Sequence, residues 1–164
     1  MQERRQTDAI IAIVDDDPSA REGLSSLIRS MGLRVETFAS AQEFLARTGA
    51  EALSCLILDL QLPDLSGIDL QKRMAEVGLE IPIVFLTGHG DIPSSVEAIK
   101  AGAVEFLTKP VDEQKLLQAI QQAIERGGKA RQQQAELRDL RHRMLETERY
   151  ARMTATESEK YADE

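Results

Sequence analysis

The chain has no tryptophan and only one cysteine, and aromatic residues make up 4% of its 164 positions. The single cysteine, Cys55, excludes an internal disulfide and is compatible with a reducing compartment. No apolar run approaches the roughly 20 residues that are needed to span a bilayer. The polar N-terminal residues lead straight into a predicted strand, so no secretory signal is visible. We therefore expect a cytoplasmic protein with no membrane partner.

Positively charged residues are also outnumbered by negatively charged ones. The chain carries 20 Lys and Arg residues against 28 Asp and Glu residues, which gives a formal net charge of -8. Such a balance argues against a general electrostatic affinity for nucleic acid or anionic membranes. The length allows one domain of ordinary size and an additional extension.

Short apolar runs alternate along the chain with segments of helical pattern. The runs that begin at Ile10, Cys55 and Ile83 are nearly unbroken, as expected for central strands of a parallel sheet covered on both faces. Repeated βα units predict an α/β domain with a doubly wound, five-stranded parallel sheet over residues 8–126. The predicted strands are Ile10–Val14, Arg34–Phe38, Cys55–Leu58, Ile83–Leu86 and Glu105–Thr108.

The helices between these strands have recognisable starts. Asp17 can cap the first helix, with Pro18 at its first position. The sequence "SAQE" at residues 40–43 is typical of a capping box, Ser66 is a candidate cap for the third helix, and Asp112 begins the fifth.

Beyond the predicted domain the pattern changes. "GG" at 127–128 interrupts the pattern, and residues 129–153 contain no Gly or Pro and favour a helical tail or linker. Its seven basic and four acidic residues up to position 152 indicate a solvated helix with a dimer seam, a possible short coiled coil, rather than a nucleic-acid arm. Residues 154–164 are polar and are expected to be disordered. The seam comprises Leu137, Leu140, Met144, Thr147 and Ala151.

Polar residues follow four of the predicted strands. Asp15 and Asp16 follow the first strand, Asp59 the third, Thr87 the fourth, and Lys109 the fifth. Because the carboxyl ends of parallel strands meet at one edge of a sheet, these side chains should form one cluster. Carboxylates with no His or Cys beside them suit a hard cation such as Mg²⁺. A carboxylate beside Mg²⁺ and a lysine can accept a phosphoryl group, because both cations neutralise its charge.

Each of these residues also has a simpler interpretation. The "DDD" at 15–17 can be a helix N-cap with acids near the helix dipole, and Asp59 can be a turn residue. Thr87 can be an ordinary strand-end threonine and Lys109 a solvated charge. Their occurrence together at successive strand ends favours a chemical site.

As a set, "IVDDD", "LILDLQLPDLSG", "LTGHGD" and "FLTKP" resemble the receiver domain of bacterial two-component response regulators, most closely of the FixJ/NarL type. The resemblance covers about the first 126 residues and implies a flavodoxin-like sheet with strand order 2-1-3-4-5. It implies a phosphoacceptor switch protein rather than an enzyme. Asp59 would take a phosphoryl group from a sensor histidine kinase, and the domain would catalyse only its own phosphotransfer and autodephosphorylation.

The resemblance also implies the ligands of Mg²⁺. Asp16 would bind the ion directly and Asp15 mainly through water, together with Asp59 and the backbone carbonyl of Gln61. Gln61 and His89 occupy positions that tune dephosphorylation in the family, although a solvated loop imidazole is an equally good interpretation of His89.

The remaining roles implied by the resemblance concern the switch. Lys109 would pair with the phosphate, and its peptide bond to Pro110 would be cis. Thr87 would move toward the phosphate, and Phe106 would turn inward into the space vacated.

The implied output is a phosphorylation-dependent homodimer that regulates transcription, formed through the fourth helix, fifth strand and fifth helix. Regulators of this type usually continue into a DNA-binding domain, and we expect none within these residues. One alternative is a single-domain regulator that signals through its tail. An FMN-binding flavodoxin-like module is disfavoured because three aspartates would repel the cofactor's phosphate. A dehalogenase-like phosphatase would need an aspartate where Gln61 stands.

Overall fold

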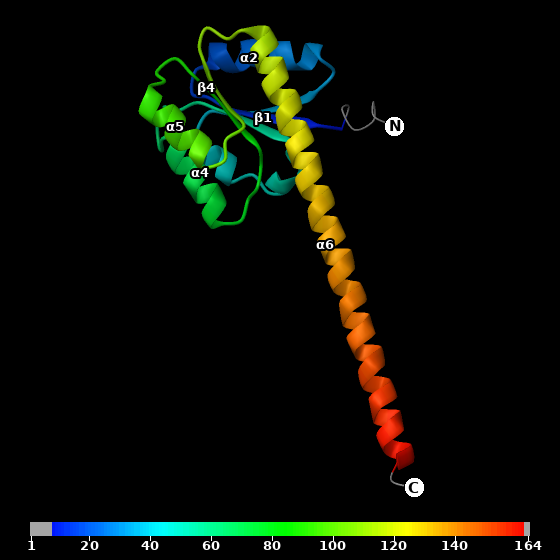
Figure 1. The fold of residues 1–164 in the computed structure, drawn as a ribbon. Helices are drawn as coiled ribbons and strands as arrows, with labels where there is room; N and C mark the ends of the chain where they lie inside the picture. The colour runs from blue at the N-terminus through cyan, green and yellow to red at the C-terminus, as the bar shows by residue number, and fades with distance from the viewer. Residues whose placement is uncertain (1–7, 163–164) are drawn as a thin grey trace. The chain divides into compact units, whose positions relative to one another are not determined.

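A computed structural model describes residues 8–162, with side chains described for residues 8–155. Within this part of the chain, five parallel strands form one sheet in the order β2-β1-β3-β4-β5 (Figure 1). This confirms the predicted doubly wound sheet; β4 is one residue longer than predicted and ends at Thr87. The strands are β1 (Ile10–Val14), β2 (Arg34–Phe38), β3 (Cys55–Leu58), β4 (Ile83–Thr87) and β5 (Glu105–Thr108).

The helices begin at the predicted caps. The side chain of Asp17 accepts a hydrogen bond from the amide of Ser19, and that of Ser40 accepts one from Glu43. Such caps satisfy amide groups that have no partner within the helix, and each contributes about 1 kcal/mol. The helices are α2 (Pro18–Ser30), α3 (Ala41–Leu45), α4 (Gly67–Glu76), α5 (Ile92–Lys100) and α6 (Glu113–Ala162), with a 3-10 helix at Ala50–Ala52.

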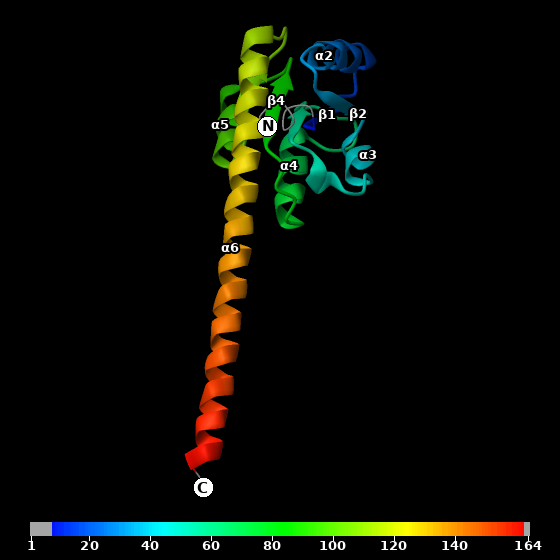
Figure 2. The same cartoon turned by 90° about the vertical axis from the view of Figure 1, so that its right-hand side faces the viewer.

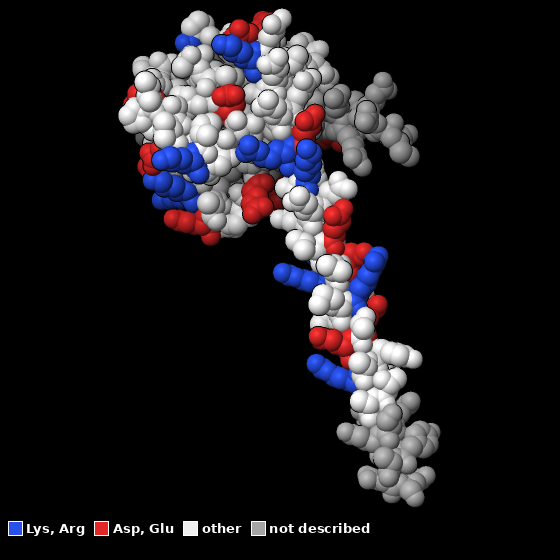
Figure 3. Space-filling model, in the orientation of Figure 1, with Lys and Arg blue, Asp and Glu red and all other residues white. Residues whose placement is uncertain are grey.

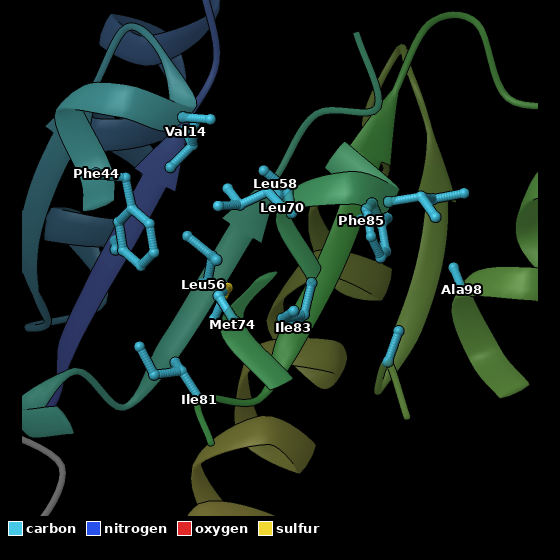
Figure 4. Close-up of a cluster of buried hydrophobic side chains, with 14 of the residues drawn as sticks. Val14, Phe44, Leu56, Leu58, Leu70, Met74, Ile81, Ile83, Phe85 and Ala98 are labelled. Carbon is cyan, nitrogen blue, oxygen red and sulfur yellow. The ribbon is translucent and has the colours of Figure 1, made fainter. Parts of the chain in front are cut away.

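Helices flank both faces of the sheet (Figures 1 and 2), and an apolar layer covers each face. Because successive strand residues point to opposite faces, Leu56 and Leu58 pack toward α3, α4 and α5, where Figure 4 shows them near Met74 and Leu70. Ile57 points to the other face and packs with α2 and the first turns of α6. Strands that are buried on both faces require apolar residues at every position, which explains the unbroken runs in the sequence.

The single cysteine belongs to the second of these layers. Cys55 is fully buried in β3, and burial raises the pKa of its thiol to about 12. The thiol therefore stays protonated at neutral pH, and Cys55 acts as a small apolar side chain.

The C-terminal part of the chain differs from the prediction. α6 passes through Gly127–Gly128 without a break, although the sequence pattern changes there. A glycine costs about 1 kcal/mol relative to alanine inside a helix, which the strong helix formers on both sides tolerate. The backbone is also helical from residue 154 to Ala162, where we expected disorder; residues 163–164 lie outside the described part.

The chain divides into two compact units, the first ending at Gly127 and the second beginning at Gly128. The first unit contains the sheet and α2 to α5, and the second consists of helix within its described residues. In the described part of the chain, no helix combines the length and the apolar character that a membrane span requires.

Candidate functional site

Three carboxylates meet where β1 and β3 end. Val14 lies beside Leu58 in the parallel register, so the residues that follow them, Asp15 and Asp59, leave the sheet side by side. One oxygen each from Asp15, Asp16 and Asp59 lies within 4.8 Å of the others. Asp15 is 2% and Asp59 8% exposed, whereas Asp16 is exposed. The fold therefore brings together the three acids that the sequence placed at the strand ends.

An ammonium group lies against the two buried carboxylates. Lys109 Nζ donates to Asp15 Oδ2 at 2.6 Å and to Asp59 Oδ2 at 3.3 Å. The pairing of β5 with β4 brings Lys109 to this position. The Lys109 amide continues that pairing beyond β5, because it donates a hydrogen bond of 2.8 Å to the carbonyl of Thr87. Burial alone would lower the pKa of Lys109, but the hydrogen bond to Asp15 and the charge of Asp59 raise it, so the group is positively charged. The peptide bond to Pro110 is cis.

Backbone groups hold the buried acids in place. Asp15 Oδ1 accepts a hydrogen bond from the amide of Asp17 at 2.9 Å, and its carbonyl accepts one from the Arg21 guanidinium at 2.6 Å. Asp59 Oδ1 accepts one from the amide of Gln61 at 3.2 Å. These bonds limit rotation of both carboxylates and fix the direction of their oxygens.

Thr87 and Phe106 lie on neighbouring strands beside the acidic cluster. Thr87 is fully buried, and its Oγ1 accepts a hydrogen bond from the amide of His89 at 3.2 Å. The half-buried ring of Phe106 packs on Phe85, with 5.8 Å between centroids. A Cβ atom on Gly90 would lie 2.7 Å from Cε1 of Phe106, so the ring rests directly on the loop backbone. Sequence reasoning quoted Gly90 within "LTGHGD" but assigned it no role.

A polar cleft of about 320 Å³ lies beside the acidic cluster, between α4 and α5. Gln61 and His89 both line it, so the two loops that carry them face the same space. Further along, Lys72 of α4 and Glu97 of α5 form an exposed ion pair of 3.1 Å in the cleft.

Asp64 has a structural function that sequence reasoning missed. Its Oδ2 accepts a hydrogen bond from the amide of Gln42 at 2.8 Å, and its Oδ1 accepts one from Ala41 at 3.2 Å. Burial opposes ionisation, but these backbone hydrogen bonds outweigh it and lower the pKa of Asp64. Asp64 thereby ties the loop after β3 to the first turn of α3. Its partners lie 22 and 23 positions earlier, and no local pattern indicates such a contact.

The fold and the clustered acids define a doubly wound α/β domain with an acidic centre at the carboxyl edge of its sheet. Comparison with known families gives a match to the response regulator receiver domain over residues 11–121. The chain belongs to this family, whose members are signalling modules of two-component systems rather than metabolic enzymes. The sequence left three classes of protein open: a receiver, an FMN-binding module and a dehalogenase-like phosphatase. The family match supports the receiver.

Individual proteins give the same result. The chain is 53% identical over 123 residues to response regulator protein TmoT of Ectopseudomonas mendocina, covering 75% of this chain and 56% of that protein. The structure of the response regulator StyR is similar over 82% of this chain and 68% of the StyR chain, with a TM-score of 0.77 and 47% sequence identity. The structure of FixJ-N is similar over 72% of this chain and 94% of the FixJ-N chain, with a TM-score of 0.65 and 38% sequence identity. The chain spans about half the length of several curated relatives that it matches, for example 51% of TodT.

The donor set of the cluster fits Mg²⁺, which receiver domains generally bind at an acidic pocket. Asp15, Asp16 and Asp59 offer only oxygen ligands, which a hard divalent cation prefers. A single ammonium group, that of Lys109, bonds to two of the three carboxylates. A bound cation would therefore relieve repulsion that Lys109 offsets only in part.

Adding Mg²⁺ is expected to stabilise the folded protein. A ligand that binds only the native state at 100 times its dissociation constant contributes about 2.7 kcal/mol, which corresponds to a rise in melting temperature of roughly 10 °C for a domain of this size. Thermal melts with MgCl₂, against NaCl of equal ionic strength, measure this shift. Asp16→Asn should lose most of this shift, because it removes one of the three clustered carboxylates. Asp16 is exposed, so its replacement disturbs no packing. Asp8→Asn is the matched control, and equal shifts in all three proteins would exclude a site at Asp16.

Proposed function

We propose that residues 8–126 are the receiver of a response regulator, which accepts a phosphoryl group on Asp59 from the phosphohistidine of a sensor histidine kinase. Phosphorylation shifts the protein toward a homodimer, and the output is regulation of transcription. The observation that carries this proposal is the contact of the Lys109 ammonium with Asp59 inside a cluster of three carboxylates.

The chemistry requires a nucleophilic oxygen with positive charge beside it. An oxygen of Asp59 forms a bond to phosphorus while the bond from phosphorus to the donor nitrogen breaks, which leaves an acyl phosphate and a neutral histidine. The ammonium of Lys109 already lies 3.3 Å from Asp59 Oδ2, where it stabilises charge on the transferred group. The hydroxyl of Thr87 is a donor on the adjoining strand.

Asp15, Asp16 and Asp59 are the side chains that would hold Mg²⁺, with the backbone carbonyl of Gln61 as a further ligand. The ion supplies electrostatic stabilisation of the phosphoryl oxygens when it is bound. Asp16 is the exposed member of the set and is best placed to bind directly, because both oxygens of Asp15 already accept hydrogen bonds from Asp17 and Lys109.

The switch lies in Thr87 and Phe106. When the Thr87 hydroxyl turns toward a phosphoryl group it gives up its bond with the His89 amide, and Phe106 moves inward from its position against Gly90. Because Phe106 has no hydroxyl, its two positions differ in packing alone. Gln61 and His89 line the adjoining cleft and set access of water to the acyl phosphate, which tunes autodephosphorylation.

Apolar side chains on α5 support a dimer interface on this side of the domain. Ile92, Val96 and Ile99 are 80%, 45% and 45% exposed and lie three to four positions apart, so they share one side of the helix. Exposed apolar side chains grouped on one side of a helix support the proposal of an interaction site there. The loop between β4 and α5 joins Thr87 to this surface, which couples the switch to association.

Beryllofluoride, which mimics a phosphoryl group on a carboxylate, tests this function. With Mg²⁺ it should shift the full chain toward dimers in sedimentation velocity, and Asp59→Asn should show no shift. Asp69→Asn, which removes an exposed acid from α4, is the matched control and should respond like the wild type. The same association in wild type and Asp59→Asn would contradict the proposal.

A further inference from the structure

The second unit carries an apolar stripe along its helix. Leu137, Leu140 and Met144 are 55%, 54% and 58% exposed, and their spacing of three and four positions places them on one side of α6. Thr147 and Ala151 continue the stripe at the same spacing. Leu145, Tyr150 and Met153 are exposed as well, at 64%, 71% and 62%, so what distinguishes the stripe is its regular spacing on one side of the helix and the charges beside it.

We propose that this stripe pairs with the same stripe of a second copy of the chain, as a parallel, in-register, two-stranded coiled coil over residues 130–151. In heptad notation Leu137 and Met144 occupy position a, and Leu140 occupies position d. The inference goes beyond the proposed function, because it concerns the second unit and requires no phosphorylation of Asp59.

Charged residues beside the stripe specify the register. In a parallel coiled coil, position g of one helix lies near position e of the partner five residues further on. Glu136 then faces Arg141 of the second copy, and Arg143 faces Glu148 of the second copy. A shift by one heptad would instead place Glu136 against Glu148, or Arg143 against Arg141. The in-register pairing therefore places opposite charges at these positions, whereas a register shifted by one heptad places like charges there.

The apolar layers specify the direction. In the parallel pairing, Leu137, Leu140 and Met144 each meet their own copy, which gives three consecutive apolar layers. The antiparallel pairing that also matches the charges places Leu137 against Thr147, which breaks this run. Arg143 already pairs with Asp139 in its own helix at 3.0 Å, but an ion pair between two exposed side chains is weak and does not prevent a second contact.

The overall charge pattern of the helix argues against a partner of one sign. On the face that Figure 3 shows, acidic and basic side chains are interspersed along the second unit, without a continuous surface of one charge. A nucleic acid or a strongly acidic protein would require such a surface. With only three large apolar layers, the coiled coil is weak and reversible, so its detection requires a method that traps transient pairs.

Disulfide trapping in the full chain tests the proposal. Ala130→Cys and Ala151→Cys place a thiol at position a near either end of the stripe, and Ala135→Cys places one at position f, on the opposite side. Diamide oxidises two thiols to one disulfide and is itself reduced to the hydrazine. Cys55 is fully buried and does not compete. Both position-a variants should form covalent dimers roughly tenfold faster than Ala135→Cys, because the coil raises the effective concentration of their thiols.

Other outcomes are equally decisive. Equal rates for all three variants would overturn the coiled coil, and a disulfide formed only in a mixture of Ala130→Cys and Ala151→Cys would replace it by an antiparallel pair. Arg141→Glu should slow trapping of Ala151→Cys several-fold, because it places two glutamates opposite each other, whereas Arg138→Glu makes the same charge change away from the interface and should not. These measurements use unphosphorylated protein, so a failure of the beryllofluoride experiment leaves them unaffected.

Discussion

Replacing Asp59 by asparagine is expected to abolish covalent phosphorylation of the protein. With acetyl phosphate as donor, an oxygen of Asp59 bonds to phosphorus and acetate leaves, whereas an amide is not nucleophilic enough to replace it. The substitution keeps the shape of the side chain and its position at the end of β3. Incubation with radiolabelled acetyl phosphate and Mg²⁺ should label the wild type with a hydroxylamine-sensitive group and leave Asp59→Asn unlabelled.

The labelled position can be identified by mass spectrometry after borohydride reduction of the acyl phosphate. Asp15 is the closest competitor, because it is also buried and also in contact with Lys109. However, both of its oxygens accept short hydrogen bonds, of 2.9 Å and 2.6 Å, whereas those to Asp59 are 3.2 Å and 3.3 Å. Label on Asp15, or undiminished label in Asp59→Asn, would show that the nucleophile has been assigned to the wrong carboxylate.

Replacing Gly67 by alanine is expected to destabilise the first unit strongly. A Cβ atom there would lie 2.3 Å from the carbonyl oxygen of Asp59 and 3.1 Å from Cα of Leu60. Both are backbone atoms, and they cannot move without displacing the end of β3. We expect a loss of about 3 kcal/mol or more, equivalent to roughly 10 °C in melting temperature, with slower phosphorylation of the folded fraction.

Gly23 is the matched control for this substitution. It lies within α2, and an added Cβ would meet no atom within 4 Å. Gly23→Ala should therefore raise the stability by about 0.5–1 kcal/mol, because alanine is the better helix former. If thermal unfolding showed the two variants to be equally stable, the close approach of Gly67 to Asp59 would not be the reason for a glycine at that position.

The position of the acidic cluster could be predicted because it follows from local patterns and one geometric rule. Strands β1 and β3 are recognisable from their apolar runs, and parallel strands place the residues that follow them at one edge. The motifs added the identity of Asp59 as the candidate nucleophile. Lys109 was expected in the same cluster, but its hydrogen bond to Asp15 was not predicted, because strand order places a residue at the edge and does not fix which way a long, flexible side chain points.

Other parts of the molecule had no signal that sequence reasoning could use. Asp64 caps α3 from a distant loop, and Gly90 is a glycine because the ring of Phe106 occupies the space of its side chain. At Gly127–Gly128 the sequence pattern changes where the two units divide, but α6 is not broken there, because helix propensity is a small energy per residue and the surrounding sequence outweighs it.

The amino-acid sequence alone determined the strands, the helix caps and the order of the chemical groups along the chain, because these depend on side-chain periodicity and hydrogen bonds between near neighbours. Only the tertiary structure decided which groups touch: the ammonium of Lys109 between two carboxylates, the ring of Phe106 on Gly90, and Asp64 on α3. Such contacts join segments that are distant in sequence, and they exist only once packing of the sheet and helices has brought those segments together.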